Sequence, residues 1–245
     1  MKKLLLSTIA LALVSCAKEN TTLSAQHDLS LSSKIELSNS AIVAVDPARN
    51  PNNPFDEVGK VHDQLFEAYF AMTTHDKSIA GIAAEVESLA AASHAFSGIR
   101  GASTSRNTAA KLQSLVGTET TAVSDAINKS SLSQYAKSSL QNFCDKIVVL
   151  YPSVDEFDPL FTFIANYESQ LAGDSKLTPV EREKILTVTS ITRYSTYKGK
   201  KKPKKNNDSD WDMMGFGLAG SIDGIEKNPA ESIITAFSAK VLQNK

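Results

Sequence analysis

The residues best suited by type to contact a ligand are the lysines near position 200. Six ammonium groups fall within eight residues, at Lys198, Lys200, Lys201, Lys202, Lys204 and Lys205. Tyr194, Tyr197 and Trp211 flank this lysine segment, and such rings can stack on a sugar or a base. Runs of like charge are usually solvated. The pattern therefore favours a solvated loop, with a contact site for an anion or a glycan as the alternative. That alternative site consists of Lys200, Lys201, Lys202, Lys204, Lys205, Tyr197 and Trp211.

Acidic residues follow the lysine segment at once and offset part of its charge. Asp208, Asp210 and Asp212 are spaced like the start of a calcium-binding loop. Such a loop needs glycine at its sixth position and glutamate at its twelfth, where this chain has Met213 and Ala219. We therefore expect no calcium site. With 26 basic and 27 acidic residues the chain is nearly neutral, so we expect no nucleic-acid partner either.

The glycine run at positions 215–220 (GFGLAG) has the spacing of a dinucleotide-binding loop. That loop requires a buried strand before it and a further strand with an acidic residue after it. Here a polar, aspartate-rich stretch precedes the run, and too little chain follows to complete a nucleotide-binding unit. We reject the nucleotide site and expect no cofactor. Gly217, Gly220 and Gly224 instead indicate a helix face that a neighbouring helix approaches closely.

No catalytic or metal-binding constellation is visible among the histidines and cysteines. His27, His62, His75 and His94 lack the spacing of metal ligands, so we expect surface or capping roles for them. Cys144 lies among apolar residues at helical spacing and is expected to be a buried hydrophobic residue, not a nucleophile. We predict no catalytic residue and no metal, while carboxylates that are distant in sequence leave a hydrolase as an alternative.

The elements that position these residues are predicted to be helices. From Phe55 onward apolar residues recur at steps of three and four, as in buried helix stripes. The first stripe is Val58, Val61, Leu65, Ala68 and Met72. The second is Ile79, Ile82, Val86, Leu89, Ser93 and Phe96. We expect an all-α fold, an irregular bundle of about seven or eight helices.

Helix starts are marked by capping patterns along the second half of the chain. Residues 131–134 (SLSQ) resemble a capping box. Residues 178–181 (TPVE) and 228–231 (NPAE) each place proline at the first helical position and glutamate two residues later. The segment 186–197 is rich in threonine, valine and tyrosine, so a strand is an alternative there, although the pattern favours helix.

The first sixteen residues resemble the signal sequence of a bacterial lipoprotein. Lys2 and Lys3 precede an apolar stretch, which ends in the run Leu13-Val14-Ser15-Cys16. This run matches the lipobox, in which an aliphatic, a permissive and a small residue precede a cysteine. The resemblance implies that the signal is cleaved before Cys16, that its sulfur receives a diacylglycerol, and that its new amine is acylated. An ordinary cleaved signal with an incidental cysteine is the alternative.

The lipobox divides the chain into a signal peptide at 1–15, a flexible tether at 16–50 and a helical domain at 51–245. No later apolar stretch approaches the ~20 residues of a spanning helix, so the membrane is expected to hold the protein through its N-terminal lipid. Lys18 and Glu19 resemble the charged signals that send some Bacteroidetes lipoproteins to the cell surface. The expected location is the cell envelope, at the outer membrane.

The start of the helical domain resembles uncharacterised helical proteins of Bacteroidetes. The shared features are the pattern NPFD-x-VGK-x-H from Asn53 to His62 and a glycine-rich helix near the C-terminus. This resemblance carries no known activity. We expect a lipid-anchored envelope or surface protein that binds a protein or glycan partner. A glycan-binding lipoprotein is the first alternative, suggested by the larger starch-utilisation lipoproteins of Bacteroidetes, and a hydrolase is the second.

Overall fold

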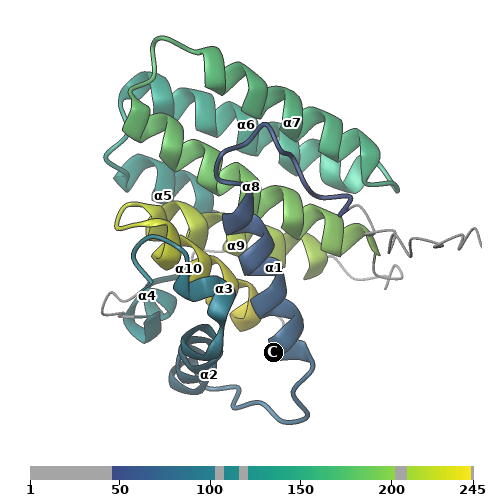
Figure 1. The fold of residues 1–245 in the computed structure, drawn as a ribbon, viewed down its shortest axis with the longest axis vertical. Helices are drawn as coiled ribbons and strands as arrows, with labels where there is room; N and C mark the ends of the chain where they lie inside the picture. The colour runs from purple at the N-terminus through teal and green to yellow at the C-terminus, as the bar shows by residue number, and fades with distance from the viewer. Residues whose placement is uncertain (1–45, 103–107, 116–120, 202–208, 244–245) are drawn as a thin grey trace, which may run out of the picture. The chain divides into compact units, whose positions relative to one another are not determined.

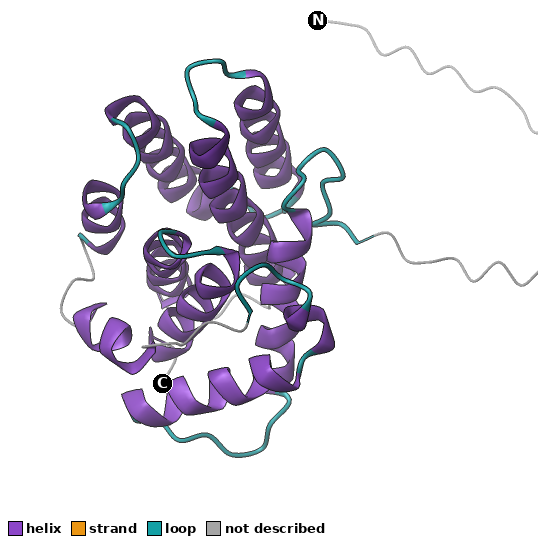
Figure 2. Cartoon of the chain, turned by 60° about the vertical axis from the view of Figure 1, so that its left-hand side comes forward, coloured by secondary structure: helices purple, strands orange, loops and turns teal. Residues whose placement is uncertain are grey.

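The computed structural model describes residues 46–102, 108–115, 121–201 and 209–243, and residues 209–213 by their backbone alone. This part of the chain contains ten helices and no strand (Figures 1 and 2), so the all-α prediction is confirmed. The helices are α1 (Asp56–Phe70), α2 (Ile79–Ala92), α3 (His94–Ser97), α4 (Thr108–Leu115), α5 (Ala122–Lys129), α6 (Gln134–Ser153), α7 (Asp158–Gly173), α8 (Pro179–Lys201), α9 (Ser209–Ile225) and α10 (Pro229–Gln243).

Helix α8 lies at the centre of the described helices. Every residue from Ile185 to Tyr194 is buried, because other helices and the segment before α1 pack around this helix. One apolar cluster joins α8 to α5, α6, α7 and α9, whereas a second joins α1, α2, α3, α4 and α10. Ile191 belongs to the second cluster, while its neighbour Val188 belongs to the first. Figure 1 shows α6 and α7 on one side of α8 and α1 on another.

The threonine-rich part of α8 is helical although its composition also suits a strand. The hydroxyls of Thr189, Ser190, Thr192 and Thr196 are hydrogen-bonded within the helix or to α1 and α7. The buried hydroxyl of Thr187 has no hydrogen-bond partner among the described residues. The Thr192 hydroxyl donates to the Val188 carbonyl at 2.8 Å, and the Thr196 hydroxyl donates to the Arg193 carbonyl at 2.9 Å. Ser190 Oγ accepts from the backbone N–H of Gly59 at 3.0 Å. Burial on all sides and these internal bonds outweigh the modest preference of β-branched residues for strands.

The capping patterns mark real helix starts, with one correction. Thr178 and Glu181 form the predicted reciprocal box, since Glu181 N donates to Thr178 Oγ1 and Thr178 N donates to Glu181 Oε2. Helix α6, however, is capped by Ser133 and not by Ser131, because the Ser133 hydroxyl accepts from the N–H of Ala136. The Ser133 N–H donates to Glu181 Oε1 at 2.8 Å. A carboxylate of α8 thus completes the cap of α6.

The small residues of α9 face α10, as the glycine pattern predicts. A Cβ atom added to Gly220 would lie 2.5 Å from the Thr235 carbonyl oxygen, and one added to Gly224 would lie 2.5 Å from the Glu231 carbonyl oxygen. Backbone atoms cannot move aside as a flexible side chain can. The prediction of a close internal helix crossing is therefore confirmed.

Substitution of Gly220 by alanine is expected to lower the free energy of unfolding by about 1–3 kcal/mol, because the methyl group overpacks the crossing. Gly215→Ala in the same helix is the matched control, since nothing lies within 4 Å of the added methyl group. This control is expected to be neutral or stabilising by up to about 1 kcal/mol through helix propensity. Urea unfolding followed by circular dichroism measures both. Equal stability of the two variants would contradict the close crossing.

Two expectations about packed residues need correction. Met72 and Ala68 were placed in the buried stripe of the first helix, but both are exposed, and α1 ends at Phe70. Val58, Val61 and Leu65 of that stripe are buried as predicted, and the buried face of α1 also includes His62 and Tyr69. In addition, Ala48 and Asn50 are buried, so packed residues begin within the expected tether. Within the described ranges, no helix is both long and apolar enough to cross a membrane.

Candidate functional site

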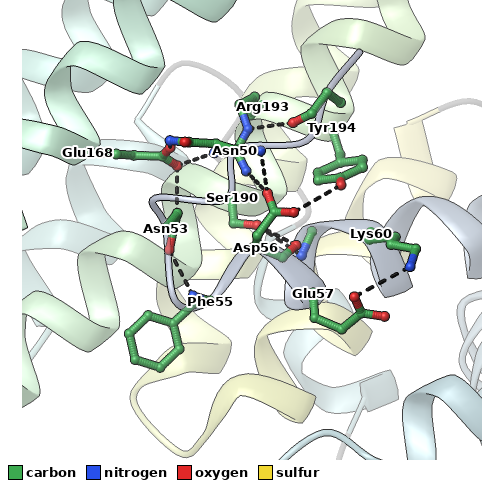
Figure 3. A network of polar contacts seen from close by, with 12 residues as sticks. Asn50, Asn53, Phe55, Asp56, Glu57, Lys60, Glu168, Ser190, Arg193 and Tyr194 are labelled. Atoms are coloured by element: carbon green, nitrogen blue, oxygen red, sulfur yellow. Dashed lines mark hydrogen bonds and ion pairs between the residues drawn. The ribbon is translucent and has the colours of Figure 1, made fainter. Parts of the chain in front are cut away.

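A buried polar cluster of the described residues surrounds Arg193 of α8 (Figure 3). Its guanidinium is fully buried and forms ion pairs with Asp56 of α1 and Glu168 of α7. The Arg193 Nε–H also donates to the Ala48 carbonyl at 2.6 Å. A single cation therefore joins residues 48–56, helix α7 and helix α8. We call this the Arg193 network; its members are Asn50, Asn53, Asp56, Glu168, Thr189, Ser190, Arg193 and Tyr194.

The carboxylate of Glu168 collects donors from the segment before α1. The Asn50 amide donates to Glu168 Oε2 at 2.6 Å, and the Asn53 amide donates to Glu168 Oε1 at 2.7 Å. The Thr189 hydroxyl donates to the same Oε1 atom at 2.9 Å. These bonds hold residues 46–55 against α7 and α8. The polar segment that the sequence places at the end of the tether is thus fixed by a buried anion.

The Arg193 network is suited to hold helices together and not to react. Within the described chain, no buried side-chain atom of the network lacks a hydrogen-bond partner. The Tyr194 hydroxyl donates to Asp56 Oδ2 at 3.3 Å, and burial together with the Asp56 charge raises the pKa of Tyr194. A general base or nucleophile needs an accessible atom with a free lone pair. The Glu168 side chain and Tyr194 are each only 1% exposed, so their oxygen atoms are not accessible to a substrate.

This geometry gives structural roles to residues of the pattern NPFD-x-VGK-x-H, which runs from Asn53 to His62. Asn53 and Asp56 supply contacts to Glu168 and Arg193, and Gly59 lets α1 cross α8. A Cβ atom at Gly59 would lie 2.5 Å from the Ser190 carbonyl oxygen. His62 lies in the core one turn further on. The roles of these residues could not be predicted from the sequence, because Asn53 and Asp56 contact partners more than a hundred residues away.

The lysine segment is only partly described, and its described part is not a solvated loop. Lys198, Lys200 and Lys201 form the last turn of α8. Lys198 pairs with Asp63 at 3.3 Å and with Glu67, both of α1. The Lys200 ammonium donates to the carbonyls of Tyr151 and Val154 at 2.6 and 2.7 Å. The loop prediction is wrong for these lysines, because the end of α8 lies against α1 and the end of α6.

The aromatic residues near the lysine segment do not form an open stacking surface in the described chain. Tyr194 is buried in the Arg193 network. Tyr197 is partly buried, with its ring 5.0 Å from that of Phe157 and the Lys201 ammonium 4.4 Å above it. Lys202, Lys204 and Lys205, the side chain of Trp211, and Cys16 lie outside the described residues.

Lys200→Met is expected to lower the free energy of unfolding by about 1–3 kcal/mol, because it removes charge-assisted hydrogen bonds to the carbonyls that end α6. The adjacent Lys201→Met is the matched control, since Lys201 is exposed and loses only its contact with the Tyr197 ring, and its expected effect is below about 1 kcal/mol. Thermal and urea unfolding measure both variants. A Lys200 effect as small as that of Lys201 would restore the solvated-loop interpretation.

Among the histidines and Cys144, His62 is the residue whose position differs from the prediction. Cys144 is buried, as predicted, and burial raises the pKa of its thiol. His62 is buried instead of lying at the surface, and neither of its ring nitrogens has a hydrogen-bond partner in the described structure. His75 stacks on Tyr69 at 4.2 Å, and His94 is exposed. Across the described ranges, no group of histidine, cysteine, aspartate and glutamate side chains is arranged to hold a metal ion.

A groove of about 440 Å³ lies between α6 and α7. We call it the α6–α7 groove; it is lined by Ser139, Asn142, Phe143, Lys146, Phe163, Asn166, Tyr167 and Gln170. The ring of Phe143 stacks on Tyr167 at 4.7 Å and on Phe163 at 5.7 Å. Its rim carries exposed amides and one ammonium group. This arrangement can bind a ligand by ring contact and hydrogen bonds, and its lining holds no carboxylate, thiol or imidazole.

Sequence reasoning missed this groove, although α7 carried a signal for it. Phe163, Asn166, Tyr167 and Gln170 follow steps of three, one and three, so they lie along one helix face. An aromatic face mixed with amides differs from a plain apolar stripe. What the sequence does not contain is the pairing of this face with α6.

Comparison of the chain with protein-family models, curated proteins and solved structures gives no match.

Proposed function

We propose that this chain is a lipid-anchored protein of the bacterial outer membrane that binds a partner through its helical domain. The single observation that carries the proposal is the run Leu13-Val14-Ser15-Cys16 after an apolar stretch with a basic start. A thiol at this position provides the atom to which a diacylglycerol is attached. Two or three acyl chains would give stable anchoring, whereas a single chain binds a membrane only marginally.

A binding role is supported by how the described domain uses its chemically capable groups. Arg193 forms internal ion pairs with Glu168 and Asp56, and the Cys144 thiol is buried. The α6–α7 groove, by contrast, presents polar side chains at the surface. These features favour recognition over catalysis. The partner is an envelope protein or a glycan, and the groove favours the glycan because it combines aromatic rings with amides.

Replacement of Cys16 by serine is expected to abolish incorporation of radiolabelled palmitate, because serine offers no sulfur for the thioether. Ser15→Ala is the matched control and is expected to keep the label, since alanine is also a small residue at the cleavage position. A chain that begins at Lys18 behind an unrelated cleavable signal is expected in the soluble periplasmic fraction. Unlabelled parent protein, or label that persists after Cys16→Ser, would disprove the lipid anchor.

A further inference from the structure

The aromatic part of the α6–α7 groove is fixed by its own packing. Phe143 of α6 is buried and its ring is nearly parallel to those of Phe163 and Tyr167 of α7, with interplanar angles of 10° and 18°. The Tyr167 hydroxyl is hydrogen-bonded to Ser139 Oγ at 2.9 Å. Phe163 and Tyr167 keep part of their surface accessible. The floor of the groove is therefore an aromatic surface that is already in place before a ligand arrives.

The rim of the groove carries polar groups that have no partner among the described residues. Asn142, Asn166 and Gln170 are exposed, and their amides make no hydrogen bond to any other described residue. The Lys146 ammonium makes no ion pair or hydrogen bond among the described residues. Elsewhere on α6 and α7, polar groups such as Gln141 and Tyr135 are paired. These unpaired donors and acceptors of the described chain lie beside the aromatic floor of the groove.

The combination of ring faces and amides indicates the chemistry of the ligand. A pyranose ring has an apolar face of C–H groups, which packs on aromatic side chains, and an edge of hydroxyls, which bonds to amides. The volume of about 440 Å³ falls within the range of about 300–1,000 Å³ typical of small-ligand sites. A phosphate-rich polymer would need several cations, whereas the described lining has one, Lys146. That lone ammonium, with no carboxylate in the lining, favours a sugar that carries a carboxylate.

We propose that the α6–α7 groove binds a short pyranose oligosaccharide of the uronic-acid type, with the sugar faces on Phe163 and Tyr167 and a carboxylate at Lys146. This inference rests on the glycan-binding form of the proposed function. It places the sugar site on α6 and α7, away from the lysine segment at the end of α8. The amides of Asn142, Asn166 and Gln170 bind the sugar hydroxyls.

Calorimetric titration of the full chain tests this site, in a polyoxyethylene detergent that has no sugar headgroup. The probes are tetragalacturonate, which carries carboxylates, and maltotetraose, which is neutral. We expect saturable binding of tetragalacturonate that is tighter than binding of maltotetraose. Asn166→Ala and Gln170→Ala are each expected to weaken it roughly 5–10-fold through loss of a hydrogen bond. Lys146→Met is expected to abolish the preference for the acidic sugar.

The controls separate the groove from general charge and from the lysine segment. Ser138→Ala changes an exposed residue of α6 outside the groove, and Lys77→Met removes an equivalent charge from the loop before α2. Both are expected to bind like the parent. The inference would be overturned if neither sugar binds. It would also be overturned if Asn166→Ala and Gln170→Ala bind tetragalacturonate with the affinity of the parent. Neither result would bear on the proposed lipid anchor, because palmitate labelling at Cys16 tests the anchor independently.

Discussion

Replacement of Arg193 by methionine is expected to lower the free energy of unfolding by about 3–5 kcal/mol. The guanidinium is fully buried and pairs with Asp56 and Glu168, whose side chains are 14% and 1% exposed. Methionine fills a similar volume but leaves both carboxylates without their cation. The loss comes mainly from the uncompensated buried charges, because a buried pair as a whole contributes little against an apolar replacement. Urea unfolding at pH 7 measures it.

Two further variants show whether charge causes the loss. Arg100→Met removes the arginine of a pair with Glu183 in which Arg100 is 67% exposed, and its expected cost is below about 1 kcal/mol. Adding Glu168→Gln to Arg193→Met is expected to recover part of the stability, because it removes one of the orphaned charges. An Arg193→Met cost no larger than that of Arg100→Met would show that the Arg193 network does not hold α1, α7 and α8 together.

The stability of the protein is expected to fall steeply as the solution is acidified, and His62 is a main cause. Burial and the nearby Lys240 ammonium lower the pKa of His62 from 6.5 to about 3. The unfolded chain takes up a proton near pH 6.5, whereas the folded chain resists it until about pH 3. The full contribution is therefore present above pH 6.5 and is lost progressively between pH 6.5 and 3. At about 1.4 kcal/mol per pH unit, the loss between pH 6.5 and 4 is roughly 3 kcal/mol.

His62→Leu is expected to flatten this part of the pH profile by that amount, because leucine takes up no proton. At pH 7.5 the variant should be about as stable as the parent, since both ring nitrogens lack partners in the described core. His94→Leu, at an exposed position of α3, is the control and should keep the parent profile. Glu181, whose pKa is lowered to about 2 by hydrogen bonds, adds an acid loss common to all three proteins. Parallel profiles for the parent and His62→Leu would contradict the burial of a neutral His62.

The helical fold could be predicted from the sequence because its signals are local. The steps of three and four, the capping residues Thr178 and Glu181, and the glycines of α9 all act within a few turns of helix. In the predicted stripe of the first helix, Val58, Val61 and Leu65 are buried as predicted, whereas Ala68 and Met72 are exposed. His62, Phe66 and Tyr69 complete the buried face of α1.

The sites could not be predicted because their members meet only in the folded chain. Asp56 and Arg193 are 137 positions apart, so no local spacing connects them. Lys200 looked like part of a charge run, yet it binds carbonyls at the end of α6. The α6–α7 groove likewise exists only because two helices place their faces together. For each residue, the partner that decides its role lies on another element.

By itself, the sequence determined the all-α class and the close α9–α10 crossing, because helix periodicity and the space that glycine leaves act over short distances. It also supports the lipid anchor at Cys16, a prediction that rests on the lipobox alone. Only the tertiary structure decided that Arg193 is a buried cation between two carboxylates, that Lys200 caps a helix, and that α6 and α7 form a groove. Burial and long-range pairing set the charge, exposure and partners of a side chain, and neither is encoded in its immediate neighbours.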